Sequence, residues 1–161
     1  MDSGGRTECT VKRQTAALPQ NRLAGAVVLH DDHILVVRRS RRERFLPGIW
    51  GIPCGKLNHG ENPTAGALRE LKEETGLTGE IRQFAGCSDF ISEWDGRPVH
   101  NIQINYLVRP LSLDVVLPER DQEYQWIRTS ELADAGLDTH NLNAITQALQ
   151  QSKTKGGDGR R

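Results

Sequence analysis

The chain has 161 residues, which is enough for one domain with a sizeable core. Its 21 basic residues balance its 21 acidic residues, so the charge gives no indication of a nucleic-acid or membrane partner. The three cysteines, Cys9, Cys54 and Cys87, follow no disulfide motif and suit a reducing, cytoplasmic compartment. The longest apolar run, residues 26–29, is far too short to span a membrane.

The domain itself is expected over residues 21–152. Residues 1–20 are polar and predict a disordered N-terminal arm, and residues 153–161 predict a flexible C-terminal tail. Residues 22–30 have an almost continuous apolar centre and predict a buried strand. A turn at residues 31–32 and a second strand over residues 34–37 would complete a hairpin.

An arginine-rich segment, residues 38–44, follows this hairpin. It is either a solvated loop or a phosphate clamp, because the planar guanidinium group matches phosphate oxygens. Residues 45–53 are punctuated by Gly and Pro and predict a structured loop that ends in a short strand. Within it, Phe45 and Trp50 either pack into the core or line a pocket.

A helix is predicted over residues 63–75. Asn62 is suited to the N-cap position and Pro63 to the first helical turn. Gly76 is suited to the left-handed residue that ends a helix. At about 100° per residue, three carboxylates share one face and an apolar stripe occupies another. The carboxylates are Glu70, Glu73 and Glu74, and the stripe is Leu68, Leu71 and Thr75.

The acidic face requires a compensating cation. Like charges three or four residues apart on a helix repel each other by a few tenths of a kcal/mol per pair. Arg69 can reach Glu73 at the i+4 position, but a divalent metal would compensate more charge. Carboxylate oxygens suit Mg²⁺ or Mn²⁺, and two ions about 3.5–4 Å apart would clamp a phosphate chain.

The stretch from Gly55 to Leu77 follows the pattern G-x5-E-x7-R-E-U-x-E-E-x-G-U at every position, where U is a bulky aliphatic residue. Seven fixed positions match by chance about once in 10⁸ trials. This stretch resembles the Nudix box, and the chain resembles the MutT-like Nudix hydrolases. The flanking W-x-x-P and E-Y-x-W-I segments fit the same resemblance. One departure is Cys54, where such proteins often have a second Gly; we expect it to be a small buried residue.

The resemblance implies metal-dependent hydrolysis of a nucleoside diphosphate linked to a group X, with Mg²⁺ or Mn²⁺ and two or more ions when substrate is bound. A nucleoside triphosphate, cleaved to a monophosphate and pyrophosphate, is the first candidate because the chain is short. The alternatives are a nucleotide sugar, a dinucleotide or a prenyl diphosphate. Residues 92–95 lack the Pro or Tyr that some ADP-ribose and dinucleotide subfamilies carry there. A non-catalytic binding module is a third reading, which the intact box disfavours.

The resemblance also implies roles for the box residues. Glu73 and Glu74 would bind metal, and Glu70 would bind metal or act as the base for the attacking water. Arg69 would hold the glutamates in place. The backbone carbonyl of Cys54 or Gly55 would be a further metal ligand. The structural residues of the motif would be Gly55, Glu61 and Gly76.

Residues outside the box also receive roles by resemblance. Arg38 or Arg39 would contact the phosphates. An acidic loop residue often reaches the metal site as a ligand or base, and Glu119 is the first choice, with Asp121 second. Plain surface charge is the alternative reading for Glu119. The substrate would be a small diphosphate, and the protein a monomer or homodimer.

The remaining chain predicts two long strands, then a loop with a short strand over residues 109–118, and two helices. Residues 80–92 predict a strand with a bulge at Gly86, and an Asp-Gly turn leads into an alternating strand over residues 99–108. The polar row of that strand faces either a cleft or water. Thr129 or Ser130 would cap a small helix, and residues 141–151 predict a final helix. The fold class is therefore α+β, with a mixed sheet between helices in an α/β/α sandwich, as the Nudix resemblance also implies.

Overall fold

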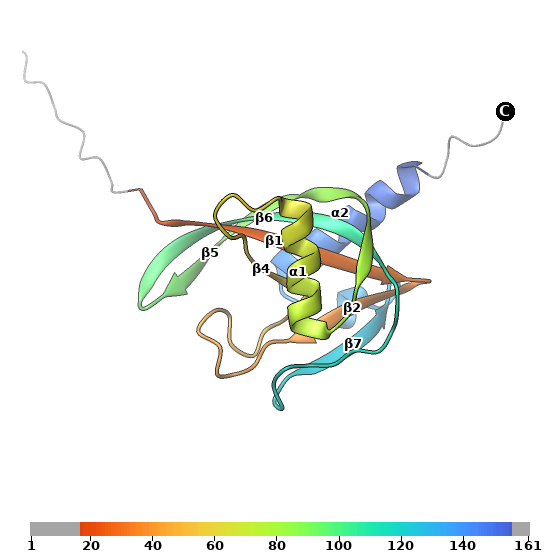
Figure 1. The fold of residues 1–161 in the computed structure, drawn as a ribbon, viewed down its shortest axis with the longest axis horizontal. Coiled ribbons are helices and arrows are strands. Elements are labelled where there is room, and N and C mark those ends of the chain that lie inside the picture. The colour runs from red at the N-terminus through yellow and green to blue at the C-terminus, as the bar shows by residue number, and fades with distance from the viewer. Residues whose placement is uncertain (1–16, 156–161) are drawn as a thin grey trace, which may run out of the picture.

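One mixed sheet organises the chain (Figure 1). The structure is a computed structural model that describes residues 17–155. Residues 1–16 of the predicted arm and residues 156–161 of the predicted tail lie outside the described part. The elements are β1 (Gln20–His30), β2 (His33–Arg38), β3 (Trp50–Gly51), β4 (Cys54–Lys56), α1 (Pro63–Thr75), β5 (Gly79–Trp94), β6 (Arg97–Pro110), β7 (Glu123–Arg128), the 3₁₀ helix η1 (Leu132–Asp134) and α2 (Thr139–Lys155). The first strand begins one residue before the expected domain boundary, and α2 extends three residues past it.

The strand order is β3-β2-β1-β6-β5, with β4 paired to β1 and β7 paired to β2. Strands β1 and β6 run parallel, and the other pairs are antiparallel. The β1–β2 hairpin and the β5–β6 hairpin were expected from the sequence. The parallel pairing of β1 with β6 was not, because it joins segments that are far apart along the chain.

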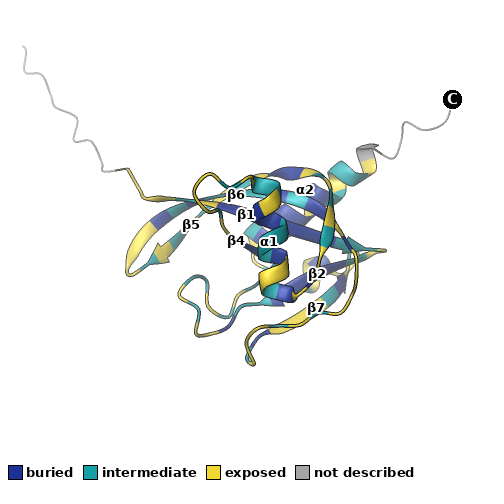
Figure 2. Cartoon of the chain, in the orientation of Figure 1, coloured by how far each residue is buried: buried dark blue, intermediate teal, exposed yellow. Residues whose placement is uncertain are grey.

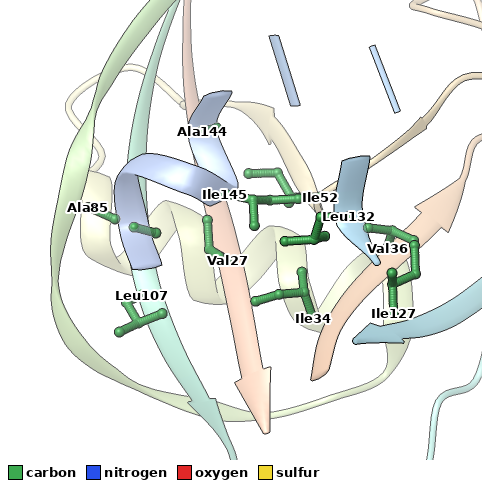
Figure 3. Packing of buried hydrophobic residues seen from close by; sticks show 11 residues of the cluster. Val27, Ile34, Val36, Ile52, Ala85, Leu107, Ile127, Leu132, Ala144 and Ile145 are labelled. Carbon is green, nitrogen blue, oxygen red and sulfur yellow. The ribbon is translucent and has the colours of Figure 1, made fainter. Parts of the chain in front are cut away.

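The two helices cover opposite faces of the sheet, which confirms the predicted sandwich. Alternate residues of β1 and β2 point to opposite sides, as strand geometry requires. On the α1 side the buried cluster contains Ala26, Val28, Leu35, Val37, Leu71, Leu77 and Val108. On the α2 side it includes Val27, Ile34, Val36, Leu107, Ala144 and Ile145 (Figure 3). Figure 2 shows the buried residues concentrated on the central strands and on the inner faces of the helices.

Helix α1 has the predicted bounds and caps. Asn62 is extended (φ −67°, ψ 130°), and its side chain accepts a hydrogen bond from the Thr64 amide. Gly76 is left-handed (φ 72°) and its amide bonds to the Lys72 carbonyl. Because both signals are local, they fix where the acidic face begins and ends along the chain.

The β5–β6 hairpin carries irregularities that shape the site. Register shifts occur between Ile81 and Gln83 and between Phe84 and Gly86, and Gly86 has a φ of 115°. The turn at Asp95 and Gly96 has positive φ at both residues, as a tight hairpin turn of this kind requires.

The polar row of β6 is buried rather than solvated. Asn101, Gln103 and Asn105 are at most 1% exposed. The Gln103 amide donates to Asn105 Oδ1 at 2.7 Å, and Asn101 Nδ2 donates to the Ser92 hydroxyl at 2.8 Å. The Gln103 and Asn105 amides lie against Gly25 of the parallel strand β1, where a Cβ atom would overlap them. Burial of this row is therefore possible because its polar groups find partners and a glycine faces them.

Two smaller predictions were wrong. Neither Thr129 nor Ser130 caps η1, because its N-cap residue is Glu131, which makes no capping side-chain bond. The Thr129 amide instead bonds to the Asp32 carbonyl, and the Glu131 amide bonds to Arg128 in a turn. The segment after β6 was expected to contain a short strand, but residues 111–122 of the described chain form none.

Among the described residues, no helix is long and apolar enough to cross a membrane.

Candidate active site

Arg69 is the centre of the acidic face. Its Nε and Nη2 atoms donate to the two carboxylate oxygens of Glu61 at 2.6 and 2.8 Å. Its Nη1 donates to Glu70 at 2.7 Å and to Glu73 at 3.1 Å, and Nη2 also donates to the Lys56 carbonyl at 3.0 Å. One guanidinium group therefore ties the loop before α1, strand β4 and two of the three helix carboxylates together.

The Glu61 carboxylate is held in the loop before α1 by hydrogen bonds from a backbone amide and from Arg69. Its carboxylate accepts the Asn58 amide at 2.9 Å in addition to the paired bonds from Arg69. The hydrogen bonds from Arg69 and then from Asn58 lower the pKa of Glu61 to about 2. The residue therefore stays ionised over the working pH range and braces the loop.

Gly55 forms the floor beneath Glu70. A Cβ atom at Gly55 would overlap the Glu70 carboxylate, so the backbone of β4 and this side chain are in direct contact. The approach requires glycine because every other residue would displace the carboxylate. Burial raises the pKa of Glu70, and the neighbouring Glu73 raises it further, while Arg69 opposes both effects.

Glu74 contacts β4 at Cys54, one residue before the contact of Glu70 with Gly55. Its Oε2 accepts the Cys54 amide at 3.2 Å, and its Oε1 lies 3.5 Å from Arg39 Nη2. The pKa of Glu74 is raised to about 8. Burial is the largest cause, Arg39 lowers the pKa, and the negative charge of Glu70 raises it further. Without a bound cation, this carboxylate is costly to keep ionised in the folded protein.

Arg39 lies directly beside the backbone of β4. Its Nη2 donates to the Cys54 carbonyl at 2.7 Å, and its Nη1 donates to Glu43 at 2.7 Å. Its guanidinium carbon lies 5.3 Å from the centre of the Phe45 ring. The Cys54 carbonyl therefore points toward the Arg39 guanidinium, and a cation in place of Arg39 would meet the same oxygen.

A cleft of about 490 Å³ opens over these groups. Its floor is formed by the Glu70, Glu73 and Glu74 carboxylates with Cys54 and Gly55. Three cations and two aromatic rings also line it: Arg39, Arg44, Lys56, Phe45 and Trp94. The volume lies within the usual range for small-molecule sites, and the combination suits an anionic ligand with an apolar or aromatic part.

Of the substrate-contacting residues predicted from the sequence, the cleft brings together Arg39 and Phe45. Arg38 and Trp50 are not among its lining residues. Arg38 donates to Glu123 at 2.8 Å and stacks over Trp50 at 5.9 Å, and Trp50 packs against the α2-side core. Neighbouring residues of a strand point to opposite faces, so only one of Arg38 and Arg39 can face the cleft.

The acidic loop after β6 contributes Glu119. Glu119 is exposed and lines the cleft, and its amide is fixed by Gln122 Oε1 at 3.0 Å. Asp121 instead joins this loop to the arginine-rich segment, accepting from the Ser40 hydroxyl and the Arg41 amide at 3.0 Å each. Glu119 is therefore the loop carboxylate that is free to reach the cleft, and Asp121 is a structural residue.

The sequence reading missed Lys56 and Trp94. The Lys56 ammonium lies 4.5 Å from the centre of the Trp94 ring, so the two side chains form one rim of the cleft. Lys56 lies within the Nudix box, at a variable position for which no role was predicted. Trp94 is at the tip of β5, and only the bulged path of that strand brings it over α1 and β4.

A second, more enclosed pocket adjoins the cleft on the α2 side. Phe90 and His140 stack across it with ring centres 4.1 Å apart. Gln103 Oε1 lies 3.3 Å from His140 Nε2 and can accept its proton, and Asn141 Oδ1 accepts the Ile52 amide at 3.0 Å. Burial lowers the pKa of His140, so this ring is neutral near pH 7. The pocket has a volume of about 20 Å³, which is space for roughly one water molecule, so it is too small for a ring.

With this geometry established, comparison with known proteins decides the family. A family model for the NUDIX domain matches residues 19–148. The chain belongs to the Nudix family. The match covers every described strand and most of α2, so the Nudix box and its flanks lie in one domain.

Relatives of this Nudix chain include several hydrolases. It is 28% identical to Nudix hydrolase 2 of Arabidopsis thaliana over 127 residues, covering 75% of this chain and 45% of that protein. It is 31% identical to the RNA pyrophosphohydrolase of Dinoroseobacter shibae over 137 residues, covering 74% of this chain and 84% of that protein. The MutT protein of Methanosarcina mazei Go1 has 26% identity and a TM-score of 0.69, with 84% and 97% of the two chains covered.

This Nudix chain spans only 30–45% of the length of three of its relatives, from Arabidopsis thaliana and Mycobacterium tuberculosis. Those relatives contain additional segments, so the match to them concerns the Nudix domain and not their whole activity.

Nudix hydrolases generally use a divalent cation. The residues of the box could bind one. The donors on offer are all oxygens, namely the three helix carboxylates and the Cys54 carbonyl, which is the set that Mg²⁺ and Mn²⁺ prefer. Within residues 17–155 no three acidic, His or Cys side chains converge on one point, and Glu70 and Glu74 contact Arg69 and Arg39 instead. Burial raises the pKa of the Cys54 thiol to about 11, so its sulfur is protonated and unsuited to the role.

Proposed function

We propose that this protein hydrolyses the diphosphate linkage of a nucleoside diphosphate joined to a group X, with a nucleoside triphosphate as the first candidate substrate. The products would then be a nucleoside monophosphate and pyrophosphate. The observation that carries this proposal is the convergence of three carboxylates, the Cys54 carbonyl and three cations on one cleft. The MutT-like relatives and the RNA pyrophosphohydrolase relative support the same reaction class.

Each group has a role in the proposed reaction. Glu70, Glu73, Glu74 and the Cys54 carbonyl would hold Mg²⁺ or Mn²⁺. Bound metal supplies charge neutralisation at the phosphate oxygens and a lower pKa for the attacking water. Arg39, with Arg44 and Lys56 beside it, would bind the phosphate chain and orient it, since guanidinium and ammonium groups complement its charge.

Proton transfer requires a carboxylate beside the water. Glu70 is the first candidate, because it lies against Gly55 and Arg69 fixes its orientation. Glu119 is the alternative, because it reaches the same cleft from the opposite loop. A positioned base of this kind contributes about 10²–10⁴ in rate, so substitution of the true base should cost that much.

Trp94 favours a second candidate substrate in which X carries an aromatic ring. The Trp94 ring and Phe45 both line the cleft beside its cations. A dinucleotide carries a second base in X, and this base would stack on one of these rings. A non-catalytic binding module is the alternative of another class, and it would bind such a compound without turning it over.

A screen with product identification tests the proposal. Purified protein with Mg²⁺ or Mn²⁺ is offered nucleoside triphosphates, dinucleotides, nucleotide sugars and prenyl diphosphates. Pyrophosphate with a monophosphate indicates the first candidate, and two nucleotides indicate a dinucleotide. Tight binding with no product would favour the non-catalytic module, and E74Q is the matched control for a contaminating hydrolase.

A further inference from the structure

We infer that Arg39 stands in for a cation in the metal-free protein and competes with divalent metal for the Cys54 carbonyl and Glu74. The inference rests on the proposed function, because it concerns the groups that would hold the metal. It assigns Arg39 a second role, as a positioning residue that keeps these groups in place before metal binds.

The contacts of Arg39 carry this inference. Its Nη2 donates to the Cys54 carbonyl at 2.7 Å and lies 3.5 Å from Glu74 Oε1, so one nitrogen lies between two proposed metal-binding oxygens. The side chain is only 16% exposed, and that of Glu74 is 21% exposed. When Glu74 is ionised, this partly buried carboxylate requires a compensating charge, and the Arg39 guanidinium is the cation in contact with it.

Glu43 provides Arg39 with a second attachment. Its Oε2 accepts Arg39 Nη1 at 2.7 Å, independently of the Cys54 and Glu74 contacts. Glu43 is itself held by the Ser40 amide at 3.3 Å and by Gln122 Nε2 at 3.5 Å. Nη2 can therefore leave the Cys54 carbonyl while Nη1 stays bonded, which keeps the guanidinium at the edge of the cleft.

The remaining charges around Arg39 are consistent with competition. Glu70 lies on the same floor but is bonded to Arg69, so Arg39 is the cation in contact with Glu74. Two positive charges about 4 Å apart repel even at the dielectric constant of water, and the repulsion doubles when one is divalent. Divalent metal and the observed position of Arg39 are therefore mutually unfavourable, and each metal-binding event must move the guanidinium.

Metal affinity measured without substrate tests this role. Free Mn²⁺ is titrated into the full chain and counted by electron paramagnetic resonance, for the wild type and Arg39→Met. Methionine keeps an apolar stem against Phe45 while it removes the charge. We expect R39M to bind Mn²⁺ about tenfold more tightly than the wild type. Unchanged or weaker binding by R39M would overturn the inference.

Arg38→Met is the matched control, because Arg38 is the neighbouring arginine and pairs with Glu123 away from the cleft. It should leave the Mn²⁺ affinity unchanged, and a tightening as large as that of R39M would overturn the inference as well. In EDTA, R39M should melt at a lower temperature than the wild type, and saturating Mn²⁺ should narrow the difference. A difference that Mn²⁺ leaves unchanged would indicate a structural role alone.

Arg39→Lys keeps the test decisive if R39M does not fold. Arg39 reaches Glu43 and the Cys54 carbonyl with two separate nitrogens, which lysine lacks, so R39K should leave the carbonyl less occupied and bind Mn²⁺ more tightly than the wild type. Affinity equal to or below that of the wild type would overturn the inference. Failure of the proposed function would give a different result from failure of this inference. The wild type itself would then show no Mn²⁺ binding or no turnover.

Discussion

At the scale of single residues, two arginines control the acidic site in different ways. Arg69 bonds to Glu61, Glu70 and Glu73 and to the Lys56 carbonyl, so it fixes the directions of side chains that leave α1 and its loop. Arg39 contacts Glu74 and the Cys54 carbonyl, two residues before Lys56 along β4. Three clustered carboxylates are tolerable in this fold because each has a guanidinium partner.

Arg69→Ala tests the positioning of the carboxylates. The substitution leaves Glu61 and Glu70 without their main partner, and removal of such an orienting group typically costs 10–100-fold in metal affinity or activity. We expect Mn²⁺ affinity and turnover both to fall by about that factor. Arg109→Ala is the control, because it also breaks one arginine–glutamate pair, to Glu80, but at an exposed site. Equal losses in the two variants would contradict the assigned role.

Glu74 predicts a pH dependence of stability for the metal-free protein. Its pKa is raised to about 8 in the folded state from an ordinary value of 4.5. The folded state therefore holds a proton that the unfolded state releases, so this group stabilises the fold fully below pH 4.5 and its contribution is lost as pH rises toward 8. In EDTA the melting temperature should fall across this window, and E74Q should fall less steeply. A wild-type slope matched by E74Q would contradict the cause given for the shift.

At the scale of elements, α1 carries the chemistry and its ends determine where that chemistry lies. The Asn62 side chain accepts hydrogen bonds from both the amide and the hydroxyl of Thr64, at 2.9 and 2.6 Å. On the other side of the helix Leu71 is fully buried against the sheet. The capped start and the buried stripe together place the acidic face over β4.

Asn62→Ala tests the cap. Loss of an N-cap side chain costs about 1 kcal/mol, which corresponds to a fall of about 2–4 °C in melting temperature for a domain of this size. Asn62→Asp retains an oxygen acceptor and should remain close to the wild type. Thermal unfolding monitored by circular dichroism measures both, and identical midpoints for N62A and the wild type would show that the cap is not needed.

Local signals explain which elements the sequence predicted well. Helix α1 was predicted to the residue because Asn62, Pro63 and Gly76 act on their immediate neighbours. The burial of Asn101, Gln103 and Asn105 could not be predicted, because it depends on the parallel pairing of β6 with β1 and on Gly25. The prediction of a cap at Ser130 was wrong for a similar reason, because a long-range contact was not visible in the sequence. The Thr129 amide bonds to the carbonyl of distant Asp32.

At the scale of the whole molecule, the sandwich brings four separate segments to one cleft: β4 with α1, the loop after β2, the β5–β6 turn and the loop before β7 (Figure 1). The box could be read from the sequence because its residues are neighbours along the chain. Trp94 could not, because only the bulged hairpin carries it there. The reaction class therefore rests on local pattern, and the choice of X rests on long-range packing.

The most direct test of the account is turnover in water enriched in oxygen-18, with Mg²⁺, for the wild type, E70Q and E74Q. We expect the wild type to cleave a diphosphate linkage and to place one labelled oxygen in one of the two products, with no turnover in EDTA. E70Q and E74Q should fold, as circular dichroism would report, and lose most of this activity, by about 10²-fold or more. Wild-type turnover by either folded variant, or turnover that persists in EDTA, would contradict the account.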